Sequence, residues 1–153
     1  MKIVSGAQTG VDRAALDAAL ESNVEACGWC PEGRLSEDGI ISEKYPVQEL
    51  PNSGYIQRTR QNVIDSDGTV IIYFGYPYGG TEQTISFCIQ ESKPYVLIDA
   101  EELSIERASI KINKFIRERS VLIMNVGGPR AGGEPRAYEY AKKVIKNVLR
   151  NNS

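Results

Sequence analysis

Three glycine-rich turns hold the residues of this 153-residue chain best suited to binding chemistry. Glycine lets a backbone approach a ligand closely, and a helix N-terminus offers unpaired N–H groups and a positive dipole end to an anion. Each turn follows an apolar run, so we expect all three to meet at one phosphate-binding site. The residues expected to contact the ligand are Gly6, Ala7, Gln8, Thr9, Gly10, Asp12, Gly79, Gly80, Thr81, Gly127, Gly128, Pro129 and Arg130.

The polar side chains of these turns favour binding over a purely connecting role, although an ordinary turn between strand and helix remains the alternative for each. Thr81 can cap the following helix and hydrogen-bond a phosphate. Arg130 adds a bidentate donor for phosphate or carboxylate. The first turn has neither the GxGxxG spacing of a dinucleotide fingerprint nor the GK[ST] element of a P-loop, so neither of those sites is predicted.

The segment Cys27-Gly28-Trp29-Cys30 is a CxxC pair. One pair supplies too few ligands for a tetrahedral zinc site, and it precedes Pro31 instead of opening a helix as a redox motif does. We interpret the cysteines as buried or incidental and predict no metal site. Trp29 either packs in the core or stacks on a flat heterocycle.

Composition excludes several function classes. The chain has no histidine, which removes Ser-His-Asp and Cys-His nucleophiles and His-ligated metals. Its net charge of −2 comes from interspersed acidic and basic residues, so we expect neither nucleic acid nor a membrane as partner. Three cysteines, no apolar run near the roughly 20 residues of a membrane span and no signal-peptide profile predict a cytoplasmic protein.

Apolar periodicity indicates which elements position the turns. We expect strands over 2–5, 24–30, 69–74, 95–98 and 121–126, helices over 11–21, 55–64, 82–90, 103–117 and 135–149, and a long loop over 31–52. In the helix over 55–64, we expect Tyr55, Ile56 and Val63 to face inward. This alternation predicts a single α/β domain over 1–153, a Rossmann-like, doubly wound, mostly parallel sheet with helices on both faces. Ligands of such sheets bind at the carboxyl ends of the strands, where all three turns lie.

Taken together, several short segments resemble the molybdenum carrier family, which is also described as molybdenum cofactor carrier-like. The segments are 5–13, 28–31, 37–39, 62–63, 65–69, 79–81 and 125–130. The resemblance covers nearly the whole chain. It implies a Rossmann-like domain that binds the molybdenum cofactor (molybdopterin), a related phosphorylated pterin or a nucleotide.

A more distant similarity is to the lysine-decarboxylase-like phosphoribohydrolases, in the segment from Arg58 to Thr81. Those enzymes have a PGGxGTxxE motif that supplies phosphate contacts and a catalytic Glu. Here the motif is shortened, Thr84 occupies the position three residues after Thr81, and Glu82 is displaced from it. This difference argues against glycosidic hydrolysis but does not argue against anion binding.

Two function classes follow, and the residues leave open whether any reaction is catalysed. In a carrier, Arg58 and Arg130 neutralise the phosphate of a small ligand while Gln8 or Trp29 contacts its heterocycle. In a nucleotide-processing N-glycosidase, Glu82 or Asp12 is the acid–base group. A nucleotide-sensing module that reports to a partner is a third hypothesis. We expect a small phosphorylated ligand as the partner and a homo-oligomeric protein.

Overall fold

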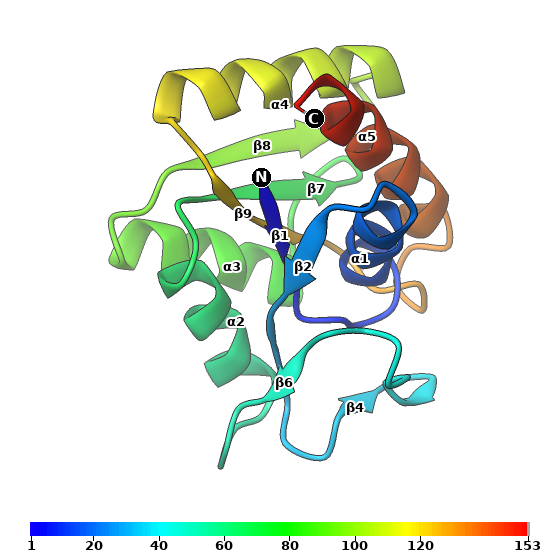
Figure 1. Ribbon diagram of the computed structural model, residues 1–153, viewed down its shortest axis with the longest axis vertical. Helices are drawn as coiled ribbons and strands as arrows, with labels where there is room; N and C mark the ends of the chain where they lie inside the picture. The colour runs from blue at the N-terminus through cyan, green and yellow to red at the C-terminus, as the bar shows by residue number, and fades with distance from the viewer. Residues whose placement is uncertain (153) are drawn as a thin grey trace.

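A five-stranded parallel sheet forms the centre of the computed structural model, which describes residues 1–152 (Figure 1). Residue 153, the last of the expected single domain, lies outside the described residues. The strands are β1 (Lys2–Val4), β2 (Glu25–Cys27), β7 (Gly68–Tyr73), β8 (Tyr95–Asp99) and β9 (Ile123–Gly127). Their order is β2-β1-β9-β7-β8, and every neighbouring pair is parallel.

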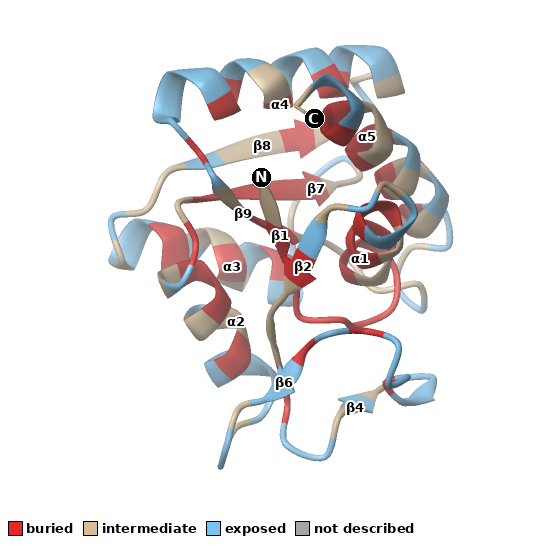
Figure 2. Ribbon diagram, viewed as in Figure 1, coloured by how far each residue is buried: buried red, intermediate tan, exposed pale blue. Residues whose placement is uncertain are grey.

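Helices cover both faces of this sheet. They are α1 (Val11–Glu21), α2 (Tyr55–Ile64), α3 (Gly79–Gln90), α4 (Ile105–Arg119) and α5 (Ala137–Asn151). Figure 1 shows α1, α4 and α5 on one face and α2 and α3 on the other. The buried residues are concentrated in the central strands and the inner helix faces (Figure 2). The predicted Rossmann-like, doubly wound fold is therefore confirmed.

The strand order explains why the three turns meet. From β1 the chain moves through α1 to one edge strand, β2, whereas from β7 it moves through α3 to the other edge strand, β8. Strand β9 then returns between β1 and β7. Such a reversal of strand order opens a crevice at the carboxyl ends of the strands. The turns after β1, β9 and β7 consequently lie side by side.

The strand expected over 24–30 is wrong in one respect, because it is broken at Gly28. The residue has φ of +147°, and an added Cβ would collide with the backbone of Ser5. Glycine alone adopts this conformation without strain. The chain therefore leaves the main sheet, and β3 (Trp29–Cys30) pairs with β6 (Gln48–Glu49) in a separate two-stranded sheet.

The long loop expected over 31–52 is present and contains a hairpin of β4 (Leu35–Ser36) and β5 (Gly39–Ile40). One guanidinium organises the segment. Arg34 donates hydrogen bonds to the carbonyl oxygens of Ile41, Ser42, Tyr45 and Val47 at 2.8–3.3 Å. Because a single charged group satisfies four carbonyls, the loop holds a defined shape with little regular structure.

Helix α2 has the predicted bounds, but two of the three residues expected to face inward do not. Val63 is buried, whereas Ile56 is 51% exposed and Tyr55 is 36% exposed. The buried face contains Arg58 and Asn62 instead. Arg58 and Asn62 occupy the part of this face that borders a cavity, while Val63 packs in an apolar cluster. Apolar periodicity alone therefore predicted the wrong rotation of α2 about its axis.

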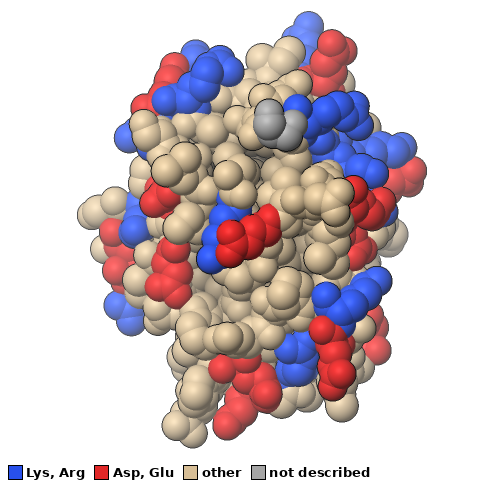
Figure 3. All heavy atoms as spheres, viewed as in Figure 1, with Lys and Arg blue, Asp and Glu red and all other residues tan. Residues whose placement is uncertain are grey.

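The described surface mixes both signs of charge. Figure 3 shows basic and acidic side chains interspersed over the visible face. Many are paired, for example Lys142 with Glu21 at 2.6 Å and Arg60 with Glu91 at 2.8 Å. Among residues 1–152, no helix combines the length and apolar character needed to cross a membrane.

Candidate functional site

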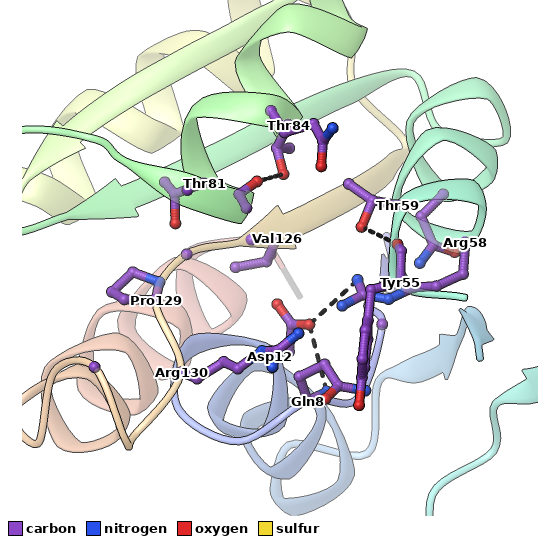
Figure 4. Close-up of a pocket in the computed structure, with 18 of the residues that line it drawn as sticks. Gln8, Asp12, Tyr55, Arg58, Thr59, Thr81, Thr84, Val126, Pro129 and Arg130 are labelled. Atoms are coloured by element: carbon purple, nitrogen blue, oxygen red, sulfur yellow. Dashed lines mark hydrogen bonds and ion pairs between the residues drawn. The ribbon is translucent and has the colours of Figure 1, made fainter. Parts of the chain in front are cut away.

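A cavity of about 260 Å³ lies at the carboxyl ends of β1, β9 and β7 (Figure 4). All three glycine-rich turns line it, and α2 contributes one wall. The predicted residues in the lining are Gly6, Gln8, Asp12, Arg58, Gly79, Gly80, Thr81, Gly127, Gly128, Pro129 and Arg130. The long-range convergence of these segments makes this cavity the candidate site.

Ala7, Thr9 and Gly10 were also predicted to contact the ligand, but they lie behind the cavity wall. The Thr9 hydroxyl accepts a hydrogen bond from the amide of Ala131 at 3.1 Å, and Gly10 packs so tightly on Pro129 that no side chain would fit. Ala7 is held at φ +62° while Arg13 donates to its carbonyl at 3.0–3.1 Å. Thr9 and Gly10 therefore fix the first turn against the third.

The β4–β5 hairpin closes one side of the mouth. Glu37 accepts hydrogen bonds from the Thr9 hydroxyl and, at 2.9 Å, from the amide of Gly132. Arg13 binds Asp38 at 2.9 Å. These bonds hold the pKa of the Glu37 carboxyl below its usual range, mainly through Thr9, and lower the pKa of Asp38 to about 2, mainly through Arg13. The hairpin is therefore attached to the site by charge-assisted hydrogen bonds.

The floor of the cavity is a buried ion pair. Arg58 Nη1 lies 3.6 Å from Asp12 Oδ2, and both side chains are about nine-tenths buried. The guanidinium rests on the backbone of Gly6, where an added Cβ would collide with it. Burial raises the pKa of the Asp12 carboxyl, and the positive charge of Arg58 opposes that shift. The pair thus places a donor group and an acceptor group together in a place shielded from water.

Two buried polar atoms beside this pair have no hydrogen-bond partner among residues 1–152: Gln8 Oε1 and Arg58 Nε. Gln8 is 1% exposed and Arg58 is 9% exposed. An unpaired buried polar atom costs roughly 1–3 kcal/mol, and such atoms are rare in folded proteins. Both residues also line the cavity, so these two atoms lie in the wall next to it.

Helix α3 points its N-terminus at the same cavity. It begins at Gly79, three residues before the predicted start, so Gly79 and Gly80 form its first turn. Tyr78 is the N-cap residue, and within residues 1–152 no side chain caps the helix. The prediction that Thr81 caps it is therefore wrong, because Thr81 already lies inside the helix. No described atom lies within 4 Å of a Cβ added at Gly79 or Gly80, so an anion can approach these amides.

Sequence reasoning missed the aromatic rim. Tyr55 and Tyr78 line the cavity, and the guanidinium carbon of Arg130 lies 4.3 Å from the centre of the Tyr55 ring. The position of Tyr78 directly before Gly79 was an available signal. Tyr55 carried none, because its contact depends on how α2 packs. Asn125, Thr59, Gln83 and Thr84 also line the cavity.

Trp29 and Glu82 lie outside this lining. The Trp29 indole donates to Asp65 Oδ2 at 2.7 Å, and its ring borders a separate hollow of about 270 Å³ with Lys2 and Cys27. Glu82 is exposed on α3. In the part of the chain that the structure describes, no three His, Cys, Asp or Glu residues gather closely enough to hold a metal ion.

This fold and cavity define a Rossmann-like α/β domain with a crevice at the carboxyl ends of its strands. Residues 3–149 match the circularly permutated YpsA SLOG family, and the chain belongs to that family. It is also similar to the crystal structure of a protein from Syntrophus aciditrophicus SB that is named as a molybdenum carrier. The two are 44% identical with a TM-score of 0.95, over 97% of this chain and 94% of that chain. The predicted resemblance to the molybdenum carrier family is thereby confirmed. No curated protein matches the chain.

Proposed function

We propose that this protein is a carrier that binds a phosphorylated pterin or nucleotide-like molecule in the cavity, with the molybdenum cofactor as its principal ligand. One observation carries the proposal: the uncapped N-terminus of α3 borders the same cavity as Gln8 and Arg58, two side chains that each have a buried polar atom without a partner among residues 1–152. An anion would pair with the amides at the N-terminus of α3, and a polar heterocycle would pair with Gln8 and Arg58. A phosphorylated heterocycle offers both groups in one molecule.

The phosphate is assigned to the rim side of the cavity. The amides of Gly79 and Gly80, with the α3 dipole, stabilise a negative group there. Arg130 adds a positive charge and a planar set of donors from the third turn. Arg58 was expected to share this phosphate, but its charge is already balanced by Asp12 at 3.6 Å. We therefore assign the phosphate chiefly to Arg130 and α3.

The molybdenum cofactor fits this donor set through its organic part. Its phosphate suits the α3 N-terminus, and its pterin suits the buried polar atoms near Gln8. Among residues 1–152 no cluster of metal-ligating side chains is present, so in this proposal the metal is held by the cofactor's own atoms. The cofactor would supply a molybdenum centre to a recipient enzyme, while this chain binds, shields and releases it.

Binding is favoured over glycosidic hydrolysis by the position of the carboxylates. Thr84 lines the cavity at the place where the resembled phosphoribohydrolases have their catalytic Glu, and its hydroxyl donates to the carbonyl of Gly80 at 2.9 Å. Glu82 lies outside the lining. Asp12 borders the cavity, but it is paired with Arg58. A general acid–base group at the usual position is therefore replaced by a hydroxyl.

The proposal is tested with protein purified from cells that synthesise the molybdenum cofactor. Native mass spectrometry should detect a bound pterin phosphate, and acid oxidation of the sample should release a fluorescent pterin in a near-equimolar amount. Incubation with nucleoside monophosphates, followed by chromatography, should return the nucleotides unchanged. Release of free base would support the hydrolase instead, and the absence of binding to any phosphorylated heterocycle would refute both.

A further inference from the structure

The inner end of the cavity has a defined order of donors and acceptors. Gln8 Nε2 donates to the carbonyl of Leu35 at 2.9 Å. This bond assigns the amide orientation, because the flipped form would place two oxygen acceptors against each other. The atom of Gln8 that remains without a partner is therefore the acceptor Oε1. An N–H or O–H donor would satisfy it.

Asp12 adds a second acceptor. Its Oδ2 faces Arg58 Nη1 at 3.6 Å and accepts from the amide of Gln8 at 3.4 Å, as the dashed lines of Figure 4 show. Both contacts are long, and both use the same oxygen, which leaves Oδ1 to accept a further bond. Burial raises the pKa of Asp12 and the charge of Arg58 opposes that shift; in the ionised form that Arg58 favours, a carboxylate has about four acceptor positions. Among residues 1–152, Arg58 Nε is the unpartnered buried donor beside these acceptors.

Neighbouring polar side chains in the lining are already engaged. Asn62 accepts from the amide of Trp29 at 2.8 Å and donates to its carbonyl at 3.0 Å. Thr59 donates to the carbonyl of Tyr55 at 2.8 Å. Gln8 Oε1, Asp12 and Arg58 Nε therefore remain as groups that can recognise a heterocycle at this end of the cavity, whereas Thr81 and Asn125 belong to α3 and to β9.

We infer that this inner end recognises the amino-oxo edge of a flat heterocycle, as found in guanine and in pterins. Such an edge presents an exocyclic amine and a ring N–H, which match the two acceptors on Gln8 and Asp12. The adjacent carbonyl oxygen matches Arg58 Nε. The inference rests on the proposed function, since it names the class of heterocycle that the same cavity accepts.

Other bases fail to match this set of groups. Adenine places an unprotonated ring nitrogen where a donor is needed. Hypoxanthine retains the ring N–H and the carbonyl but lacks the exocyclic amine. Xanthine places a carbonyl oxygen against the acceptors. Leaving one buried acceptor unpaired costs enough to weaken binding by roughly 10- to 100-fold. The expected order of affinity is GMP, then IMP, then AMP and XMP.

The test measures affinities of GMP, IMP, AMP, XMP and neopterin monophosphate by calorimetry, first for the unaltered protein. Asp12→Asn is then expected to bind XMP more tightly than GMP. Arg58 and the Gln8 amide favour the Asn oxygen on their side, which presents the new N–H donor to the xanthine carbonyl. A gain of XMP affinity cannot result from misfolding. Asp17→Asn is the matched control. Asp17 lies in the same helix, but it is not part of the cavity lining and accepts a hydrogen bond of 2.7 Å from the Tyr45 hydroxyl.

The outcomes separate the two proposals. Preference for GMP and the pterin, with reversal toward XMP in Asp12→Asn but not in Asp17→Asn, supports the amino-oxo subsite. Tighter binding of neopterin monophosphate than of GMP identifies the pterin as the source of that edge. Equal affinity for all four nucleotides overturns the subsite while the carrier function stands. If none of the five ligands binds, both proposals are wrong.

Discussion

Arg58 Nη1 lies 3.6 Å from Asp12 Oδ2 at the floor of the cavity, although the two residues belong to helices on opposite faces of the sheet. An ion pair in so buried a place is costly unless further hydrogen bonds complete it. Arg58 Nε is without a partner in the described residues. The pair is thus incomplete in the free protein, and we expect ligand binding to complete it.

Gly6→Ala should destabilise the protein, because the new methyl group would collide with the Arg58 guanidinium. Moving a buried, ion-paired side chain costs about 1–3 kcal/mol of unfolding free energy. Urea unfolding measures the change. Gly80→Ala is the matched control, since its methyl group would enter open space in the described structure and should alter stability by less than about 0.5 kcal/mol. Equal stability of the two variants would contradict the packing of Arg58 on Gly6.

Gly80→Val should abolish binding of phosphorylated ligands and leave the fold intact. The branched side chain would occupy the open space through which an anion approaches the first turn of α3. Thermal stabilisation by GMP or neopterin monophosphate should disappear, while the circular dichroism spectrum stays unchanged. If Gly80→Val binds these ligands normally, the turn is only a connection between β7 and α3.

Arg130→Ala should weaken binding of nucleotides but not of the corresponding nucleosides. Loss of a charge-assisted hydrogen bond to phosphate corresponds to roughly 10- to 150-fold in affinity. Calorimetry with GMP and guanosine makes the comparison. Arg60→Ala serves as the control, because Arg60 lies on the outer side of α2 and binds Glu91 at 2.8 Å. Equal losses for GMP and guanosine would remove Arg130 from the phosphate site.

The pair Arg58→Ala and Arg130→Ala tests whether the two arginines act on one anion. If Arg58 contacts the heterocycle and Arg130 the phosphate, their losses of binding free energy should be nearly additive in a double-mutant cycle. Strong non-additivity would instead indicate that both guanidinium groups bind the same phosphate. The affinity of GMP for the four proteins of the cycle provides the measurement.

Asp38 should make stability depend on pH in the acid range. Arg13 lowers the pKa of Asp38 from its ordinary value of 3.8 to about 2 in the folded state. Between these pH values the unfolded chain binds more protons than the native protein, so this contribution to stability is complete above 3.8 and is lost as the pH falls toward about 2. Unfolding measured over this range should show a shallower acid loss in Asp38→Asn. An unchanged profile would show that the Arg13–Asp38 bond does not stabilise the hairpin.

Local signals were enough to predict most of the fold. The apolar stripe of α5 and the apolar run of β7 are visible in the sequence because burial repeats every 3.6 residues in a helix and continuously in a covered parallel strand. The break at Gly28 was missed, since its φ of +147° follows from the approach of Ser5, which is distant in sequence.

The sequence by itself determined the order of strands and helices and the three glycine-rich turns, because these depend on periodicity and on backbone freedom within short segments. Only the tertiary structure decided which side chains meet. Asp12 and Arg58 converge because β9 returns between β1 and β7 and brings helices from both faces to one crevice. For the same reason Tyr55 lies at the rim while Trp29 lies in another hollow, since the direction of each side chain depends on how α2 and β3 are placed in the fold and not on any local pattern.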